Sequence, residues 1–313
     1  MDVHRWPGCE SPAFEGSVVT LGVFDGVHLG HQRILDRVRE EGRRLGLPSV
    51  VVTFDRHPHE VLEAPRQPCI TSLEHRLRLF EGVGLSACMV LSFTDGVAGM
   101  DAEQFARLFF WDLMRARKLV LGFDARFGKD AGGDISLCRE LGEEFGWEAE
   151  EIDPVRVDGE IVSSTRIRRA VQEADLRRAE KLLGRPFSLL GTVVSGAGLG
   201  RKLGYPTANL NVHNELLPRD GVYATYTRMN EERYASVASV GRRGTFPAET
   251  TNERVVEVHV MGMDADLYGQ EVEVEFKHRL RSQKNFEGAQ ELSEQIERDV
   301  KRARDVLDGG FRV

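Results

Sequence analysis

Two histidines stand three residues apart in the segment GVFDGVHLGHQ, residues 22–32, which overlaps the end of the first apolar run of the chain. His28 and His31 can point at one phosphate and donate hydrogen bonds to the charge that develops in a transition state. A helix that begins near Gly30 presents unpaired N–H groups, which attract anions. The structural alternative is a glycine-rich turn with two partly exposed histidines, but a place between a strand and a helix favours the chemical interpretation. The candidate nucleotide-binding residues of this turn are Gly22, Phe24, Gly26 and Gly30.

A second segment with charged groups follows a later apolar run. GFDARFGKDAGGD, residues 122–134, offers Asp124, Arg126 and Lys129. The P-loop pattern GxxxxGK[ST] is absent from the chain, so a triphosphate has to be held by scattered donors rather than by that loop.

The segment IVSSTRIR, residues 161–168, predicts a helix that starts with hydroxyl side chains. A serine there is often only an N-cap, and that alternative stays open. Arg166 and Arg168, however, lie near the helix N-terminus, where the dipole disfavours cations. A bound anion would explain them, so Ser164 and Thr165 are candidate ligands of a triphosphate and Arg168 is a candidate catalytic cation.

A third constellation lies in GTVVSGAGLGRKLGYPTANL, residues 191–210. Its glycines predict a flexible flap whose backbone N–H groups can cradle phosphates. Thr207 and Asn209 offer hard oxygens two residues apart, which suit Mg²⁺ shared with phosphates and water. A bare TAN would more often be an ordinary turn, but the preceding flap favours the metal site. The candidate nucleotide-binding residues of the flap are Gly196, Gly200, Arg201 and Lys202.

Glu257 belongs to RVVEVHV, in which three valines alternate with Glu257 and His259. Periodicity alone would leave Glu257 on a solvated strand face. A kinase that acts on a small alcohol nevertheless needs a carboxylate that orients or accepts the hydroxyl proton. Both interpretations of Glu257 therefore remain open on the sequence, while His259 is expected on a solvated strand face.

Two different patterns of hydrophobicity must position these groups. The first half alternates continuous apolar runs with amphipathic helical segments, which predicts a doubly wound parallel sheet with ligands at the carboxyl ends of its strands. Beyond residues 182–191 the apolar residues alternate with polar ones, which predicts a small antiparallel barrel or sandwich. Apolar residues three or four positions apart from Phe286 to Ala303 predict a C-terminal helix. We therefore expect an α/β domain over residues 1–185 and a β domain over residues 186–313.

Composition excludes several classes of protein. No stretch has the roughly 18 apolar residues of a membrane span, and the N-terminus has no apolar run like a secretory signal. The net charge of −8 gives no general attraction to nucleic acid. The four cysteines show no CxxC pair and no zinc spacing, so free thiols in a reducing cytoplasm are expected. The oligomeric state stays open.

The segments GVFDGVHLGHQ, GFDARFGKD and SSTRIR resemble the adenylyltransferase half of the bifunctional bacterial riboflavin kinase/FAD synthetases, and GRKLGYPTANL, GVYA and DLYGQEVEVEF resemble their riboflavin kinase module. The resemblance implies a six-stranded barrel with a C-terminal helix, ATP phosphates under the 196–202 flap and Mg²⁺ at Thr207 and Asn209. It makes Glu257 the base that activates the ribityl hydroxyl of riboflavin. It also implies that a flavin, as riboflavin, FMN or FAD, binds near Arg281 and Phe286.

Several positions depart from the family pattern: Asp55, Arg56, Ala125 and Gln283. They bear on substrate affinity more than on chemistry, because the histidines, the metal-site oxygens and Glu257 are present. Two alternatives nevertheless stay open. One is a kinase whose first domain only binds nucleotide, and the other is a non-catalytic flavin-binding or regulatory protein. A retained base and metal site argue against mere binding, and the charge and length argue against a tRNA-charging enzyme.

Overall fold

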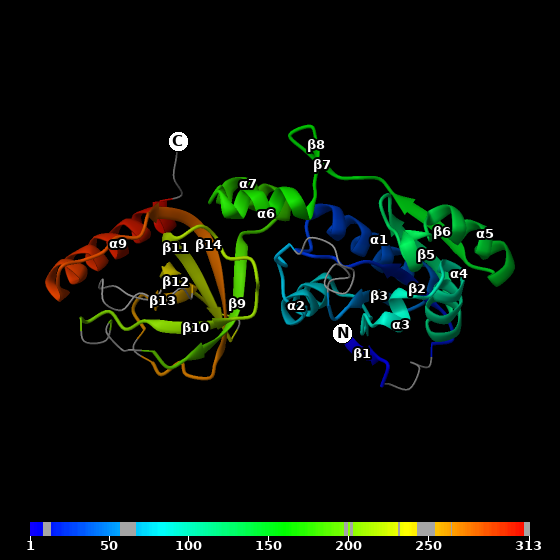
Figure 1. The fold of residues 1–313 in the computed structure, drawn as a ribbon, viewed down its shortest axis with the longest axis horizontal. Coiled ribbons are helices and arrows are strands. Elements are labelled where there is room, and N and C mark those ends of the chain that lie inside the picture. Colours follow the sequence, from blue (N-terminus) through cyan, green and yellow to red (C-terminus); the bar gives the residue numbers. More distant parts are fainter. Residues whose placement is uncertain are drawn as a thin grey trace. The chain divides into compact units, whose positions relative to one another are not determined.

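The computed structural model describes residues 1–8, 14–56, 67–196, 200, 203–230, 232–242, 254–263 and 265–309. The chain divides into two compact units, and each is described here by itself (Figure 1). The first unit consists of Met1–Cys69 and Leu73–Ser163, and the second of Ile70–Ser72 and Ser164–Val313.

The first unit is built on a six-stranded sheet in which every pair of neighbours is parallel, as expected. After β2, the chain places β3 and β4 on one side of it and then β5 and β6 on its other side. The sheet therefore has a topological switch point between β2 and β5, the place where such sheets bind ligands. The strand order is β1-β4-β3-β2-β5-β6, with bounds β1 Asp2–Trp6, β2 Ser17–Leu21, β3 Ser49–Phe54, β4 Ala87–Leu91, β5 Ala116–Gly122 and β6 Glu148–Ile152.

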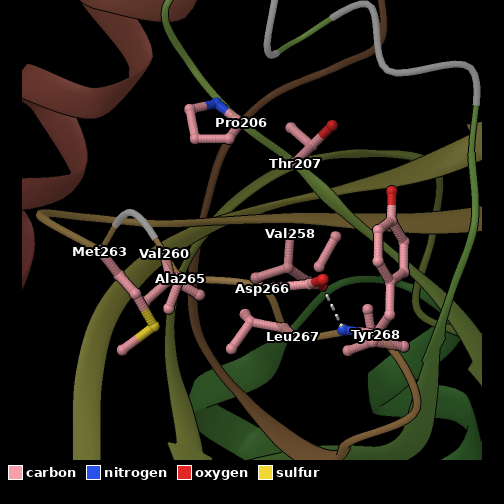
Figure 2. A pocket seen from close by; sticks show the side chains of 11 residues that line it. Pro206, Thr207, Val258, Val260, Met263, Ala265, Asp266, Leu267 and Tyr268 are labelled. Carbon is pink, nitrogen blue, oxygen red and sulfur yellow. Dashed lines mark hydrogen bonds between the residues drawn. The ribbon is translucent and has the colours of Figure 1, made fainter.

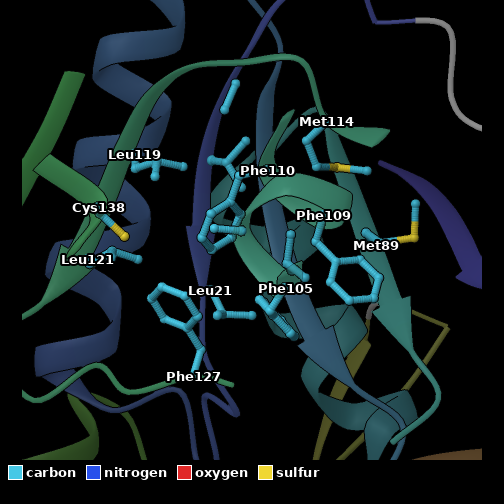
Figure 3. Close-up of a cluster of buried hydrophobic side chains, with 14 of the residues drawn as sticks. Leu21, Met89, Phe105, Phe109, Phe110, Met114, Leu119, Leu121, Phe127 and Cys138 are labelled. Atoms are coloured by element: carbon cyan, nitrogen blue, oxygen red, sulfur yellow. The ribbon is translucent and has the colours of Figure 1, made fainter. Parts of the chain in front are cut away.

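Helices cover both faces of this sheet, because successive strand residues point to opposite faces and both sets are apolar. On one face, Val18, Val51 and Val120 pack with side chains of α1 (Leu29–Leu45) and α2 (Leu73–Val83). On the other, Leu21, Met89 and Leu119 join an aromatic cluster (Figure 3). The helices that contribute to this cluster are α3 Asp95–Ala98, α4 Ala102–Phe105, the π-helical η2 Ala106–Leu113 and α5 Ile135–Phe145. A short 3₁₀ turn, η3 Lys129–Ala131, precedes α5.

The second unit is a closed antiparallel barrel of six strands, as the resemblance implied. Apolar and polar residues alternate along its strands; in β13, Val256, Val258 and Val260 are buried and Glu257 is half-buried. The barrel order is β10-β13-β12-β11-β14-β9, with bounds β9 Phe187–Val194, β10 Ala208–Val212, β11 Gly221–Met229, β12 Glu232–Arg242, β13 Arg254–Val260 and β14 Glu271–Arg281.

The C-terminal helix α9 (Ala289–Gly309) packs on the barrel through Ala303, which joins Val222 and Leu280 in a buried cluster. Phe286 lies in the loop before this helix rather than in it. Two further helices, α6 (Ser164–Gln172) and α7 (Leu176–Leu183), follow the small hairpin β7 (Arg156–Val157) and β8 (Glu160–Ile161).

Both α6 and α7 belong to the second compact unit, although the change in hydrophobic periodicity lies after them. Glu180 on α7 accepts from the Lys277 ammonium on β14 at 2.7 Å. Residues 70–72 also belong to this unit, where the buried Asn214 amide donates to the Ile70 carbonyl at 2.7 Å. The compact units therefore divide at Ser163/Ser164, whereas the expected boundary at 185/186 marks the change in strand pattern.

Candidate functional site

The turn between β2 and α1 has an unusual backbone. Phe24, Gly26 and Val27 all have positive φ, at 53°, 83° and 40°. This conformation is ordinary for glycine but strained for a β-branched residue such as Val27. Strain of this kind costs about 1–3 kcal/mol per residue and persists only where surrounding contacts impose the conformation. The turn is therefore held in place by its neighbours rather than by its own preferences.

The two histidines of this turn are brought together at the start of α1. Their rings stack with centroids 3.5 Å apart and an interplanar angle of 17°. His28 is the N-cap of the helix, and its Nδ1 accepts the backbone N–H of His31 at 3.3 Å. A neutral His28 ring with Nδ1 as acceptor carries its proton on Nε2, so that nitrogen is a donor. A Cβ on Gly30 would lie 3.2 Å from the His28 ring, so a larger residue there would require a small shift of that ring.

The loop after β5 lies on the other side of the switch point. Gly122 ends β5, and Asp124 follows it as an exposed side chain. Arg126 and Lys129 are also exposed, and the Arg126 guanidinium donates to the carbonyl of Ala125. The parallel pairing of β2 with β5 brings this loop and the histidine turn to the same edge of the sheet.

The candidate triphosphate ligands of the SSTRIR segment lie in the second compact unit. Helix α6 begins at Ser164, as expected, and Thr165 is in its first turn. Arg168 is only 8% exposed, so most of this guanidinium-bearing side chain is removed from water. The histidines and Arg168 thus belong to different compact units.

The glycine-rich flap meets the two candidate metal ligands directly. A Cβ on Gly196 would lie 2.0 Å from Nδ2 of Asn209, and one on Gly200 would lie 3.0 Å from Oγ1 of Thr207. Only glycine allows the chain to pass this close to both side chains. Arg201 and Lys202, which were expected to bind nucleotide, lie outside the described residues.

Strand pairing places Glu257 directly opposite Asn209 and, on its other side, opposite Ser239. Paired residues of neighbouring strands project from the same face of the sheet with Cβ atoms about 5 Å apart. Asn209 is 9% exposed and Glu257 half-buried, so this row is partly shielded from water. Glu257 and Asn209 therefore lie on the same face of the barrel wall, in a row that is partly shielded from water.

His259, next along β13, supports the same segment. Its Nδ1 donates to the carbonyl oxygen of Pro206 at 2.9 Å, and its ring meets the Tyr205 ring edge to face at 5.5 Å. The periodicity of RVVEVHV predicted only a solvated strand position for His259, and it could not identify Pro206 as a partner, because that contact spans distant parts of the chain.

A small pocket of about 50 Å³ opens beside Thr207. Figure 2 shows it between the segment that carries Pro206 and Thr207 and the loop that carries Leu267 and Tyr268. Its walls are mostly apolar, and the Tyr268 ring is 55% exposed beside it. An exposed aromatic face next to apolar side chains suits a flat, weakly polar group.

A larger groove of about 470 Å³ lies at another part of the barrel. This volume is within the range of small-molecule sites, whereas the first pocket is below it. Arginines at 219, 254 and 279 give the groove positive charge, and Ser282 and Gln283 add neutral polar groups. The lining residues are Gln172, Leu217, Pro218, Arg219, Asp220, Arg254, Arg279, Ser282 and Gln283.

The loop beside this groove is fastened from two directions. Arg281 makes a partly buried ion pair with Asp299 of α9, with Nη2 2.7 Å from Oδ2, and its guanidinium lies 5.9 Å from the Phe286 ring. The Gln283 amide donates to Ser239 Oγ and to the Val240 carbonyl, both at 3.1 Å. A Cβ on Gly241 would lie 2.2 Å from Gln283, so β12 is shaped to admit this side chain. The expected flavin residues thus have structural partners that the sequence did not reveal.

Other groups in the described part of the chain set limits on the chemistry. Burial raises the pKa of the Cys88 and Cys138 thiols to about 12, which makes them poor nucleophiles.

Among the described residues no three His, Cys, Asp or Glu side chains gather as a metal-binding group. No helix in the described part of the chain is long and apolar enough to span a membrane.

Two family models match the chain, one to each half. Residues 10–166 match the model described as FAD synthetase, and residues 183–307 match the model described as riboflavin kinase. Among curated relatives, the bifunctional riboflavin kinase/FMN adenylyltransferase of Pseudomonas fluorescens is 35% identical over 293 residues, which cover 94% of both chains. Proteins of the same name from Escherichia coli K12 and Bacillus subtilis 168 are 34% and 33% identical over 94% and 92% of this chain and 93% and 91% of theirs.

A solved structure has the same fold over nearly the whole length. It is described as a macrolide-efflux protein from Streptococcus pneumoniae, and it superposes with a TM-score of 0.81 at 32% identity. The match covers 97% of this chain and 99% of that one.

Proposed function

This chain belongs to the family of bifunctional riboflavin kinase/FMN adenylyltransferases, and we propose that its two activities use separate sets of side chains, one at the histidine turn and one on the barrel. It has riboflavin kinase activity and FMN adenylyltransferase, or FAD synthetase, activity. The first reaction moves the γ-phosphoryl group of ATP to riboflavin and gives FMN and ADP. In the second, the FMN phosphate attacks the α-phosphorus of a further ATP, and pyrophosphate leaves.

For the second reaction we assign His28 and His31 to the transferring phosphate. The helix N-terminus and an Nε2–H donor both favour negative charge at the start of α1. Asp124 lies at the same sheet edge, after β5. We retain Arg168 as a proposed catalytic cation and Ser164 and Thr165 as proposed ligands of the triphosphate. The hydroxyls at the start of α6 and the shielded Arg168 side chain support these roles.

For the first reaction we assign Glu257 as the base that accepts the proton of the ribityl hydroxyl. The reaction moves one phosphoryl group and one proton, so catalysis depends on positioning and charge neutralisation, with no covalent intermediate. The Glu257–Asn209 pairing carries this assignment, because it supports a base and a phosphate-binding segment on neighbouring strands.

The residues beside the flap fit Mg²⁺. Thr207 and Asn209 supply hard oxygens two residues apart, and Gly196 and Gly200 leave room that a Cβ would fill. A bound Mg²⁺ would neutralise charge on the transferring phosphates. In this proposal the flap binds the phosphates and orients them towards the strand face that carries Glu257.

Two cavities support a proposal for where each substrate binds. The exposed Tyr268 beside Thr207 offers a ring on which the base of ATP can stack, while the pocket of about 50 Å³ next to it is too small to enclose the base. The groove lined by Ser282 and Gln283 is large enough for a flavin ring, and its arginine and amide side chains can donate to the ring carbonyls. The expected flavin residues Arg281 and Phe286 do not line this groove, although Arg281 directly precedes Ser282. Three of the chain's cysteines are described and all are free thiols, which supports a reducing cytoplasm.

Chromatography of the products of riboflavin, ATP and Mg²⁺ over time tests the function. FMN should appear first and FAD should follow at the expense of FMN. Accumulation of FMN without FAD would favour the kinase-only alternative, and formation of neither would favour the non-catalytic one.

A further inference from the structure

A buried arginine on α2 holds the backbone beside the histidine turn. Nη1 of Arg76 donates to the Val23 carbonyl at 2.6 Å and to Thr53 Oγ1 at 3.1 Å, and Nη2 donates to the Phe54 carbonyl at 2.9 Å. Thr53 Oγ1 also donates to the Val23 carbonyl, at 3.3 Å. One guanidinium therefore ties together the turn after β2 and the end of β3.

Burial of this guanidinium is costly. Arg76 is only 5% exposed, and desolvation lowers its pKa, against the opposing effect of the Asp25 carboxylate. A buried charge requires well-aligned partners, and for an arginine of purely structural value an apolar side chain of similar volume would often serve as well. The planar guanidinium, however, reaches acceptors on two different segments at once.

Its acceptors lie where the backbone is under strain. Val23 directly precedes Phe24, the first of the positive-φ residues that lead to His28. The turn needs an external contact to keep this conformation, since Phe24 and Val27 would otherwise relax to negative φ. Charge-assisted hydrogen bonds from Arg76 supply such a contact.

We propose that Arg76 is a positioning residue for adenylyl transfer, which sets the histidine turn in its productive geometry through the Val23 carbonyl. This inference rests on the proposed role of His28 and His31. Arg76 acts on the backbone that carries the histidines, so its loss misplaces the donors without removing them.

Arg76→Met tests the proposal, with Arg43→Met as matched control. Arg43 is exposed on α1, and its side chain makes no hydrogen bond or ion pair among the described residues; its backbone carbonyl accepts the N–H of Gly46. A displacement of about 1 Å can cost about 10²-fold in rate. We therefore expect kcat for FAD formation from supplied FMN to fall on that scale in Arg76→Met with a nearly unchanged KM for FMN. FMN formation from riboflavin should be unchanged in both variants.

A double variant separates positioning from general destabilisation. If Arg76 acts through the histidines, Arg76→Met should slow the His31→Ala enzyme by a clearly smaller factor than it slows the wild type, because one of the groups it positions is already gone and residues that act as a unit are non-additive. Losses that multiply would overturn the proposal, as would an Arg76→Met enzyme with FAD formation within threefold of wild type. If His31→Ala itself left FAD formation unchanged, the assigned role of the histidines would fail instead.

The folding of the first unit is monitored separately. All three tryptophans, Trp6, Trp111 and Trp147, lie in that unit, so their fluorescence reports its folding. If Arg76→Met does not fold, the isosteric Thr53→Val decides. It removes one acceptor of Arg76 and one donor to Val23, and should slow FAD formation about fivefold, the equivalent of one hydrogen bond. An unchanged rate in Thr53→Val would overturn the proposal.

Discussion

Glu257 and Asn209 are direct partners in the antiparallel pairing of β13 with β10. The residue proposed as base and a residue proposed as metal ligand therefore project from one face of the barrel wall. Alternation along β13 keeps this face separate from the valines that fill the barrel interior.

Replacement of Glu257 by Gln should remove proton acceptance while side-chain size and hydrogen bonding are kept. General-base contributions are about 10²–10⁴-fold, so kcat for FMN formation should fall on that scale. Riboflavin binding, followed by quenching of flavin fluorescence, should be nearly intact. Glu297→Gln, an exposed change on α9, is the control. If kcat falls less than threefold in Glu257→Gln, Glu257 is an ordinary residue of a solvated strand face and not the base.

Mg²⁺ should bind mainly as its ATP complex. Thr207 and Asn209 are neutral ligands, so the free ion has little attraction to the site without phosphate charge. Titration calorimetry should detect weak Mg²⁺ binding to the nucleotide-free protein. Tight binding that disappears in Asn209→Ala would contradict this expectation.

Gly196→Ala should impair the kinase reaction specifically. The added methyl group would meet Nδ2 of Asn209 at 2.0 Å, so either the flap or the amide has to move. We expect a higher KM for Mg·ATP in FMN formation and an unchanged rate of FAD formation from FMN. Gly288→Ala is the matched control, because its Cβ meets nothing within 4 Å. Equal kinetics in the two variants would argue against close contact of the flap with the metal site.

The stability of the first unit should depend on pH through Glu41. The hydrogen bond from Arg44, with further contributions from Lys118 and Arg37, lowers the pKa of this carboxyl from 4.5 to about 2, although desolvation opposes the shift. A folded-state pKa below the unfolded value means that the stabilisation is present above about pH 4.5 and is lost as pH falls towards 2.

Urea unfolding followed by tryptophan fluorescence measures this effect. Glu41→Gln should lower the free energy of unfolding at pH 7 and flatten its decline between pH 4.5 and 2. Glu143→Gln, an exposed change on α5, should leave both unchanged. An equally steep acid decline in Glu41→Gln would show that other carboxyls are responsible.

The sequence predicted the fold class because the two halves differ in hydrophobic period. Continuous apolar runs indicated strands buried on both faces, and alternating runs indicated a barrel with one buried face. It did not predict β1 or β6: DVHRW and EAEEI carry mainly polar residues, since they form the edges of the sheet. Local periodicity also could not show that α6, α7 and residues 70–72 pack with the barrel, because that depends on distant partners such as Lys277 and Asn214.

The site was predictable where its chemistry is local. The histidines, the flap glycines and the PTAN oxygens are close in sequence, so spacing alone indicated them. The supports of the site are distant: Arg76 reaches Val23 across 53 residues, and His259 reaches Pro206 across 53 residues. Asp55, noted as a departure, accepts the Phe93 N–H and so joins the ends of two strands, a role that needs the fold to be seen.

The product pattern of two variants shows whether the two reactions use different side chains. His31→Ala removes a donor to the transferring phosphate, which should cost about 10²–10³ in rate, so this variant should convert riboflavin to FMN and stop there. Glu257→Gln should fail on riboflavin but convert supplied FMN to FAD at the wild-type rate. If His31→Ala abolished FMN formation in a protein that remained folded by circular dichroism, the assignment of separate sites would be contradicted.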